Sequence, residues 1–437
     1  MLRNVFVLAI VAVGTWYAFQ GPYYALLFYL WNAYFRPESW VWSPIIGQLN
    51  LSFYIGVYLV VISLLSMQQF VFNSRVALLA LFFLQTLLST WLSQYPTASW
   101  FYWWDFAKAL MITYLIVVLV TDIKRYRLAL TVISLSLGFE AAKQGWVVFV
   151  LTPGASNHNE HPFLGDNNGV ALGMMMLVPM VIALSQTAMK RWEKNAFAFV
   201  AIGVFLRGIS TYSRGGFLCG TVVTFFYLLR SPRRLMAIIS LVLIGSIVIP
   251  AMPQEFWDRM KTITASDEER DGSAAGRLWF WQVGKIMMDA RPLTGVGFMA
   301  YRDAYDDYDP SHGTLGFGSF RQSHSAWFGI GGEMGYPGLF LLIALLVQGM
   351  YTGFKIRRFT KGRPQYSELR AYGNALETSL IVYCVGGTFL NAEYSEMVWH
   401  FIGLSIALHG ILVKATADEK LTEPAPADPF RVRVQTA

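Results

Sequence analysis

The chain has 437 residues, of which 55% are hydrophobic and only 14% are charged. Apolar runs of roughly 15–20 residues, close to the length that spans a bilayer as a helix, recur from end to end. This pattern predicts an all-α polytopic membrane protein and excludes a barrel, whose strands would appear as short alternating segments. The net charge of +7 is spread over several loops and does not indicate a nucleic-acid partner. Cys219 and Cys384 both lie in apolar segments, so no disulfide framework is predicted.

The first apolar segments, 4–19 and 22–36, are short for a bilayer of roughly 30 Å. If both spanned the membrane, Met1 would lie outside. The alternative, which we predict, is that one is a half-span or re-entrant helix and the terminus lies inside, giving about twelve transmembrane helices. The flanks do not resemble those of a cleavable signal, so the segment is predicted to be retained.

The later spans follow from hydropathy alone. They are predicted at 51–67, 76–93, 106–120, 128–150, 169–187, 196–212, 216–230, 236–252, 336–353, 373–391 and 397–414. The connection 95–104 is rich in Trp and Tyr and is predicted to lie at the outer interface.

Basic residues fix the predicted orientation. Lys and Arg cluster at 124–127, 190–194, 230–234 and 355–363. The connections 152–168 and 391–396 contain neither residue type. The positive-inside bias therefore places the clusters in the cytoplasm and 152–168, 253–322 and 391–396 outside.

Arginines in two polar segments on the outer side are candidates for binding an anion. A polar break at 210–216 carries Arg214, and Arg207, seven residues earlier, is expected to share its helical face. An arginine at membrane depth faces a cavity or a partner, unless it snorkels to the headgroups. In the outer segment, Ser273 is predicted to cap a helix whose first turn presents Arg277, an arrangement suited to phosphate. The alternative is that Arg277 pairs with Glu268, Glu269 or Asp271 in the same loop.

A histidine stands where the chain re-enters the membrane. His324 lies in a polar cluster with Arg321 and Ser325, directly before a glycine-rich turn. A histidine there suits proton transfer or holding an anion, although an interfacial side chain is the simpler alternative. Glu333 would face away from His324 on a continuous helix, and could pair with it only if Gly331–Gly332 breaks that helix.

Other polar groups carry weaker signals. His158, Glu160, His161 and Asp166 lack metal-ligand spacing, and no metal or cofactor is predicted. Asp303, Asp306, Asp307 and Asp309 are predicted to form a solvated acidic face. Glu140 and Lys143 are predicted to form a buried ion pair inside an apolar segment.

At these residues the chain resembles the O-antigen ligase and polymerase family of bacterial membrane glycosyltransferases. The family signature, His then Ser/Asn/Gln, nine residues and G-x-x-G, is met by His324, Ser325 and Gly335–Gly338. Ser213–Gly215, Gly276–Arg277, Pro292, Gly295 and Gly297 also resemble the family's arginine positions and their surroundings. Residues 31–38, 165–168 and 271–275 most resemble the branch of exosortase-associated O-glycosylation ligases.

The resemblance implies a glycosyltransferase type-C-like helical fold in the bacterial inner membrane, with the active site facing the periplasm. The enzyme would move a glycan from undecaprenyl pyrophosphate to a hydroxyl of lipid A-core, a protein or another glycan, with inversion and without metal. Arg214 and Arg277 would hold the diphosphate, and His324 would act as general base or orient the acceptor. Arg207, Arg291, Arg321 and Ser325 would bind substrate. A polysaccharide polymerase or a lipid-linked glycan flippase is the alternative.

The same interpretation divides the chain into four parts. Residues 1–252 hold the N-terminal transmembrane helices, and 253–335 form a periplasmic loop with active-site residues. Residues 336–417 hold the C-terminal transmembrane helices, and 418–437, charged and proline-containing, form a disordered cytoplasmic tail.

Overall fold

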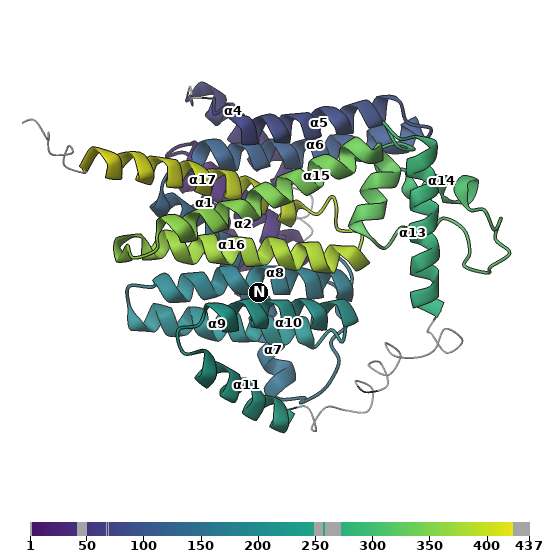
Figure 1. The fold of residues 1–437 in the computed structure, drawn as a ribbon. Coiled ribbons are helices and arrows are strands. Elements are labelled where there is room, and N and C mark those ends of the chain that lie inside the picture. The colour runs from purple at the N-terminus through teal and green to yellow at the C-terminus, as the bar shows by residue number, and fades with distance from the viewer. Residues whose placement is uncertain are drawn as a thin grey trace, which may run out of the picture.

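The computed structural model describes residues 2–41, 50–66, 68, 70–248, 257 and 272–422, and these residues form a bundle of α-helices (Figure 1). The first helices are α1 (Leu2–Ala18), α2 (Pro22–Phe35), α4 (Leu51–Leu65), α5 (Ser74–Trp91), α6 (Pro96–Leu119), α7 (Ile123–Val150), α8 (Asn167–Thr187) and α9 (Arg191–Ile209). Then follow α10 (Arg214–Arg230), α11 (Arg234–Val248), α13 (Gly272–Ala290), α14 (Tyr301–Tyr308), α15 (Ala326–Phe359), α16 (Ser367–Gly386) and α17 (Glu396–Thr422). Short 3-10 turns lie at Pro37–Ser39, Pro364–Tyr366 and Gly387–Phe389. The all-α class predicted from composition is confirmed.

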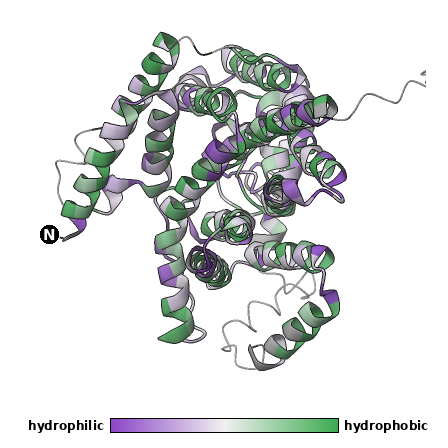
Figure 2. Cartoon of the chain, turned by 90° about the vertical axis from the view of Figure 1, so that its left-hand side faces the viewer, coloured by the Kyte–Doolittle hydropathy of each residue, from purple (hydrophilic) through white to green (hydrophobic). Residues whose placement is uncertain are grey.

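Among the residues that the structure describes, five helices are long and apolar enough to cross a membrane: α5, α6, α8, α15 and α17. Figure 2 looks along the bundle and shows hydrophobic helix surfaces around its outside. Large apolar side chains are exposed there, including Trp16 at 70% and Leu65 at 73%. Such surfaces are stable in lipid rather than in water. The total of about twelve spans stays a prediction.

The aromatic stretch 95–104 is largely helical and belongs to α6, contrary to our expectation of a connection there. α6 begins at Pro96, because proline is favoured in the first turn, where its missing N–H is not needed. Trp103 is only 6% exposed, and its Nε1 donates to Thr86 Oγ1 at 3.1 Å. The predicted start at 106 was therefore too late. Trp103 packs against α5 instead of lying at an interface.

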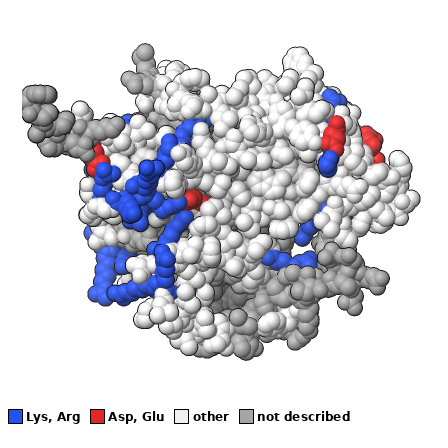
Figure 3. Space-filling model, in the orientation of Figure 1, with Lys and Arg blue, Asp and Glu red and all other residues white. Residues whose placement is uncertain are grey.

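The basic clusters converge at one end of the bundle. Arg127 of α7 lies 3.6 Å from Glu193 of α9 and 3.8 Å from Glu368 of α16. Glu377 of α16 pairs with both Arg230 and Arg357. Figure 3 shows Lys and Arg gathered at the left-hand end of the molecule. This is the arrangement that the positive-inside pattern requires.

The N-terminal helices connect this basic end with the opposite one. At the start of α2, Tyr23 donates its hydroxyl to the Arg125 carbonyl at 2.6 Å. At its end, Arg36 pairs with Glu396 at 3.2 Å. α2 therefore runs between the two ends although it has only 14 residues. The prediction that one of the first two helices stops short of a full span stays a prediction.

At the opposite end, α13 lies across the bundle, almost perpendicular to the long helices (Figure 1). Its apolar face forms a separate small core with α14, built from Phe280, Val283, Met287, Tyr301 and Tyr305. Tyr301 also donates its hydroxyl to the Phe280 carbonyl at 2.5 Å, which ties α14 to α13. α13 is thus a cap held over the end of the bundle.

α15 changes direction at one glycine. Gly335 has φ 68° and ψ −172°, a conformation that side chains disfavour. A Cβ at Gly335 would also lie 2.4 Å from the Pro292 carbonyl oxygen. Glycine is therefore required both by the positive φ and by this close approach. The part of α15 before Gly335 packs under α13, and the longer part after it enters the bundle. Our alternative of a break at Gly331–Gly332 is wrong, because the helix continues through both residues.

Candidate functional site

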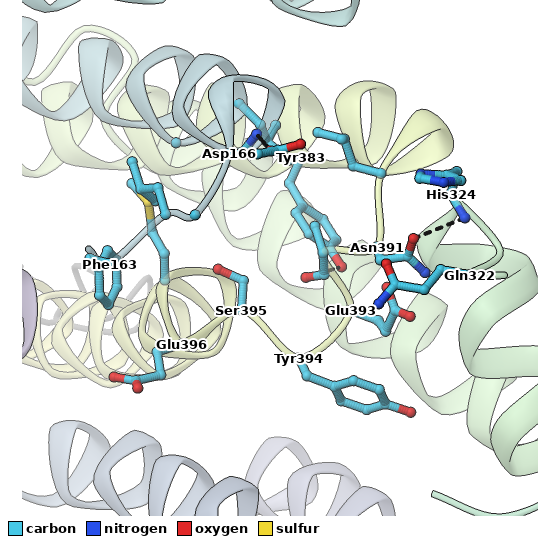
Figure 4. A pocket seen from close by; sticks show the side chains of 18 of the residues that line it. Phe163, Asp166, Gln322, His324, Tyr383, Asn391, Glu393, Tyr394, Ser395 and Glu396 are labelled. Atoms are coloured by element: carbon cyan, nitrogen blue, oxygen red, sulfur yellow. Dashed lines mark hydrogen bonds between the residues drawn. The ribbon is translucent and has the colours of Figure 1, made fainter. Parts of the chain in front are cut away.

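A cavity of about 550 Å³ lies at the α13 end of the bundle (Figure 4). Its walls come from segments that are far apart in the sequence. They are Phe163–Asp166 with Gly169, Leu172, Gly173 and Met176 of α8; Met299, Tyr301 and Arg302; Gln322, His324 and Glu333; Tyr383 of α16; and Leu390–Met397 before and at the start of α17. The cavity therefore joins loops that the sequence predicted to lie on the outer side, namely 152–168, 253–322 and 391–396.

His324 lies on the cavity wall directly before α15. Its backbone N–H donates to Asn391 Oδ1 at 2.9 Å, and Asn391 Nδ2 donates to Ser323 Oγ at 2.8 Å. Its ring centroid lies 5.9 Å from that of Phe280 in α13. Its φ of 47° is uncommon for a residue with a side chain, and such conformations concentrate at functional sites. Two other segments, the loop at Asn391 and helix α13, thus hold His324 in place.

Positive charges surround this histidine. Burial lowers the pKa of His324 below its usual value of 6.5, and the charges of Arg277 and then Arg321 lower it further. Asp166, across the cavity, acts in the opposite direction more weakly than Arg277. The net effect is that His324 stays neutral near pH 7.

Arg277 reaches this site from α13. It lies one helical turn before Phe280, so both side chains are on the same face of the helix. The predicted cap at Ser273 is wrong, because Ser273 already lies inside α13, which the structure describes from Gly272. The alternative partners of Arg277, at positions 268, 269 and 271, lie outside the described residues. Arg277 and His324 are therefore brought together by the cap rather than by the sequence.

Arg214 begins α10, close to the same cavity. α9 ends at Ile209 and α10 starts at Arg214, so the expectation that Arg207 and Arg214 share one helical face is wrong. Ser213 accepts the Gly216 N–H at 3.3 Å and donates its hydroxyl to Asn168 Oδ1 at 2.8 Å. Asn168 lies in the first turn of α8, beside cavity-lining residues. This bond anchors the base of Arg214 next to the cavity.

Arg207 is a buried structural residue in this arrangement. It is 2% exposed, and its Nε donates to Gln144 Oε1 of α7 at 2.9 Å. Its Nη1 and Nη2 donate to the carbonyls of Asn157 and Asn159 at 3.0 and 2.8 Å. The guanidinium thus holds the loop 152–168, which carries part of the cavity wall, against α7 and α9.

Replacing Arg207 by Ala is expected to destabilise the protein by on the order of 3 kcal/mol. The change removes the donor to Gln144 Oε1 and to the Asn157 and Asn159 carbonyls and creates a void at a buried position. Arg207→Lys should recover little, because an ammonium cannot reproduce the planar fork. Thermal unfolding in detergent measures the loss, with Arg191→Ala, at the exposed start of α9, as control. Unchanged unfolding of Arg207→Ala would contradict the assignment.

The other predicted binding residues lie around the cavity without lining it. Arg291 donates its Nη2 to the Leu92 carbonyl at 2.8 Å and so ties the end of α13 to the α5–α6 connection. Arg321 is exposed and donates its Nε to the Phe317 carbonyl. Ser325 occupies the N-cap position of α15, fully buried, and its Oγ has no hydrogen-bond partner among the described residues.

Two buried carboxyls of the cavity wall were not predicted as site residues. Glu333 is 5% exposed, and its oxygens accept from the Tyr394 hydroxyl at 2.5 Å and the Tyr301 N–H at 3.2 Å. Glu393 is 3% exposed. No hydrogen bond joins Glu333 to His324 in the described part of the chain, so the pairing considered from the sequence is not seen. The sequence feature that could have identified Glu393 is its position in the connection 391–396, which lacks basic residues and was predicted to lie outside.

The other acidic and histidine groups hold loops. His161 Nδ1 accepts the Phe163 N–H at 3.2 Å, and burial, followed by the charge of Arg207, lowers the pKa of His161 to about 4. Asp309 is 5% exposed and accepts from Trp279 Nε1 at 3.1 Å, so the expectation of a solvated acidic face is wrong at this residue. Glu140 and Lys143 form the predicted ion pair at 3.0 Å, although the Lys143 side chain is 54% exposed. In the ranges that the structure describes, no three His, Cys, Asp or Glu residues are grouped to hold a metal ion.

Comparison with known families separates the chain into two parts. Residues 2–192 match a family of unknown function, DUF5935, and residues 196–343 match the family described as O-antigen ligase. No curated protein matches the chain. The exosortase-associated branch stays a prediction. The second match contains Arg214, Arg277 and His324, whose surroundings are described above. The match of residues 196–343 to the O-antigen ligase family supports the resemblance seen in the sequence.

Proposed function

We propose that this multi-pass membrane protein transfers a glycan from undecaprenyl pyrophosphate to an acceptor hydroxyl in the cavity beneath α13. The family supports a glycan-transferring activity of the ligase or polymerase type. The proposal of this donor and this acceptor group is supported mainly by the surroundings of His324. Its imidazole lies on the cavity wall, and the positive charge of Arg277 lowers its pKa. One group able to hold an acceptor hydroxyl thus lies beside one able to hold a diphosphate.

The arginines act on the donor. Arg277 and Arg214 bind the diphosphate with planar guanidinium forks, which match phosphate oxygens better than an ammonium does. When the bond from the sugar to the diphosphate breaks, negative charge develops on the leaving oxygen, and these fixed cations stabilise it. This role needs no metal ion, because the arginines supply the positive charge.

His324 acts on the acceptor. Its neutral ring accepts a hydrogen bond from the acceptor hydroxyl and directs the oxygen at the anomeric carbon. Attack from the face opposite the diphosphate inverts the configuration. The donor then occupies the α13 side and the acceptor the side of 390–397.

The transfer itself tests the proposal. Purified protein is incubated with lipid-linked glycan and, in parallel, with lipid A-core, a Ser/Thr/Tyr peptide and a free glycan, and the glycosylated product is identified. A product on lipid A-core or peptide indicates a ligase, and a lengthened glycan indicates a polymerase. Activity should survive EDTA. Restoration of lost activity by Mg²⁺ or Mn²⁺ would refute the metal-independent mechanism.

The proposal requires the α13 end to lie outside the cytoplasm. Cysteine placed at Leu315, in the exposed loop after α14, should react with an impermeant thiol reagent on intact cells. Cysteine at Lys361, among the basic residues after α15, should react only after lysis. Cys219 and Cys384 are replaced by Ala in both variants. Labelling of Lys361→Cys alone in intact cells would reverse the orientation and refute the mechanism.

A further inference from the structure

One oxygen of the cavity wall lacks a partner. Glu393 lines the cavity at the same end as His324, Gln322 and Asn391, as Figure 4 shows. It is 3% exposed, and its Oε2 has no hydrogen-bond partner among the described residues. A buried carboxyl oxygen without a donor is costly, because it has lost its water. A ligand hydroxyl in the cavity would satisfy it.

The position is built to admit this carboxyl. Gly329 of α15 faces Glu393, and a Cβ at that glycine would lie 2.3 Å from Glu393 Oε1. Asn391, two residues earlier, binds the His324 backbone at 2.9 Å. The loop therefore fixes Glu393 and His324 relative to each other.

Glu333 of α15 lines the same cavity and lies close enough to Glu393 for their charges to interact. Both oxygens of Glu333 accept hydrogen bonds, from Tyr394 and Tyr301, whereas Oε2 of Glu393 has no partner among the described residues. Glu393 is therefore the carboxyl with an oxygen left for a ligand. Burial raises the pKa of Glu393 well above its usual range, and the charge of Glu333 raises it further. Because two neighbouring buried carboxylates repel each other, such a pair ionises one carboxyl before the other.

His324 is the less suitable proton acceptor. Protonating it would place a third positive charge beside Arg277 and Arg321 in a partly buried site. Protonating the carboxyl pair would instead remove a buried negative charge.

We propose that the Glu333–Glu393 pair accepts the proton of the acceptor hydroxyl, with Glu393 as the group that touches substrate and His324 orienting the hydroxyl. This inference rests on the proposed glycan transfer. The O–H bond of the acceptor breaks and its proton passes to the pair, whose charge changes from −1 to 0. The acceptor oxygen bonds to the anomeric carbon. The bond from that carbon to the diphosphate breaks, and its electron pair leaves with the diphosphate, which gains one negative charge.

Substitution by glutamine tests the pair, because it keeps the shape and removes the base. Glu393→Gln should lower turnover of the lipid-linked donor by roughly 100-fold or more, the usual contribution of a general base, with donor affinity changed less than threefold. Glu393→Asp, which keeps a carboxyl, should retain more activity than Glu393→Gln. Glu140→Gln removes a carboxyl of α7 away from the cavity and should have wild-type turnover.

Each outcome decides between interpretations. Wild-type turnover in Glu393→Gln would refute the inference and leave the proposed transfer intact. Equal loss of donor affinity and turnover would also refute it, because Glu393 would then bind donor. Equal activity of the folded Asp and Gln variants would exclude a proton-accepting role. Should Glu393→Gln fail to fold, Glu333→Gln is measured in its place, and wild-type turnover there refutes the pair. No transfer by wild type would refute the proposed function, and the inference with it.

Discussion

Arg277→Ala is expected to lower glycan transfer by roughly 30- to 1,000-fold, corresponding to about 2–4 kcal/mol of lost transition-state stabilisation. The guanidinium lies on the face of α13 that meets His324, where a diphosphate would be partly shielded from water. Removing it leaves the charge on the leaving group without a partner. Donor affinity should fall together with turnover, because the arginine contacts the diphosphate in the ground state as well.

Arg277→Lys distinguishes a fork from a simple charge. Lysine keeps the positive charge and loses the bidentate geometry, so its activity should stay well below that of wild type. Arg214 variants should behave in the same way. Lys285→Ala, on the same helix but exposed and paired with Asp289, is the control and should leave transfer unchanged. Full activity of Arg277→Lys would show that the site needs only charge, and full activity of Arg277→Ala would remove Arg277 from the mechanism.

His324→Ala is expected to lower turnover by roughly 100-fold while donor affinity changes little. The histidine is assigned to the acceptor, and loss of a precisely placed orienting group has an effect of this size. His312→Ala is a matched control. His312 lies in the same outer segment and also has a positive φ, of 46°, but it is exposed and does not line the cavity. Loss of donor binding in His324→Ala would instead identify the histidine as a phosphate ligand. Normal turnover in a folded variant would refute any role in transfer.

The pH dependence gives a second measure of the same histidine. Because burial and Arg277 lower the pKa of His324, its neutral form persists below pH 6.5. The part of the acid limb of turnover that comes from His324 should therefore lie below that pH, separate from any titration of the Glu333–Glu393 pair. Arg277→Ala removes a charge that lowers this pKa. The acid limb from His324 should therefore move to higher pH in that variant. A shift to lower pH would contradict the contact between the two residues.

The sequence predicted the parts of the fold that depend on local pattern. Hydropathy located most of the helices to within a few residues. The basic clusters were expected at one end, where ion pairs such as Arg230 with Glu377 join them. The start of α6 was missed because Trp and Tyr are typical both of interfaces and of helix packing. Only the hydrogen bond from Trp103 to Thr86 distinguishes the two.

The candidate site was predictable only where its residues stand out in the local sequence pattern. His324 and Arg277 stood out because a polar residue beside an apolar run is conspicuous in a sequence. Arg207 looked the same, yet its three hydrogen bonds show a structural role that depends on α7 and on a distant loop. Glu393 gave almost no signal. Its significance comes from Glu333 and from the gap at Gly329, both on another helix.

The role of the N-terminal region became visible only in three dimensions. Residues 2–192 match a family of unknown function, yet they supply the cavity wall from Phe163 to Met176. Arg36 at the end of α2 also pairs with Glu396, which lines the cavity. The site is therefore built from both matched parts of the chain and from the C-terminal helices.

The most direct test of enzymatic transfer is the amount of undecaprenyl pyrophosphate released for each glycan moved. The purified protein is placed in proteoliposomes with lipid-linked glycan and an acceptor, and both quantities are measured in the same sample. Our account predicts one undecaprenyl pyrophosphate released per glycosylated acceptor, and loss of both products in Arg277→Ala. Movement of intact lipid-linked glycan across the bilayer, without release of undecaprenyl pyrophosphate, would contradict the account and identify a flippase.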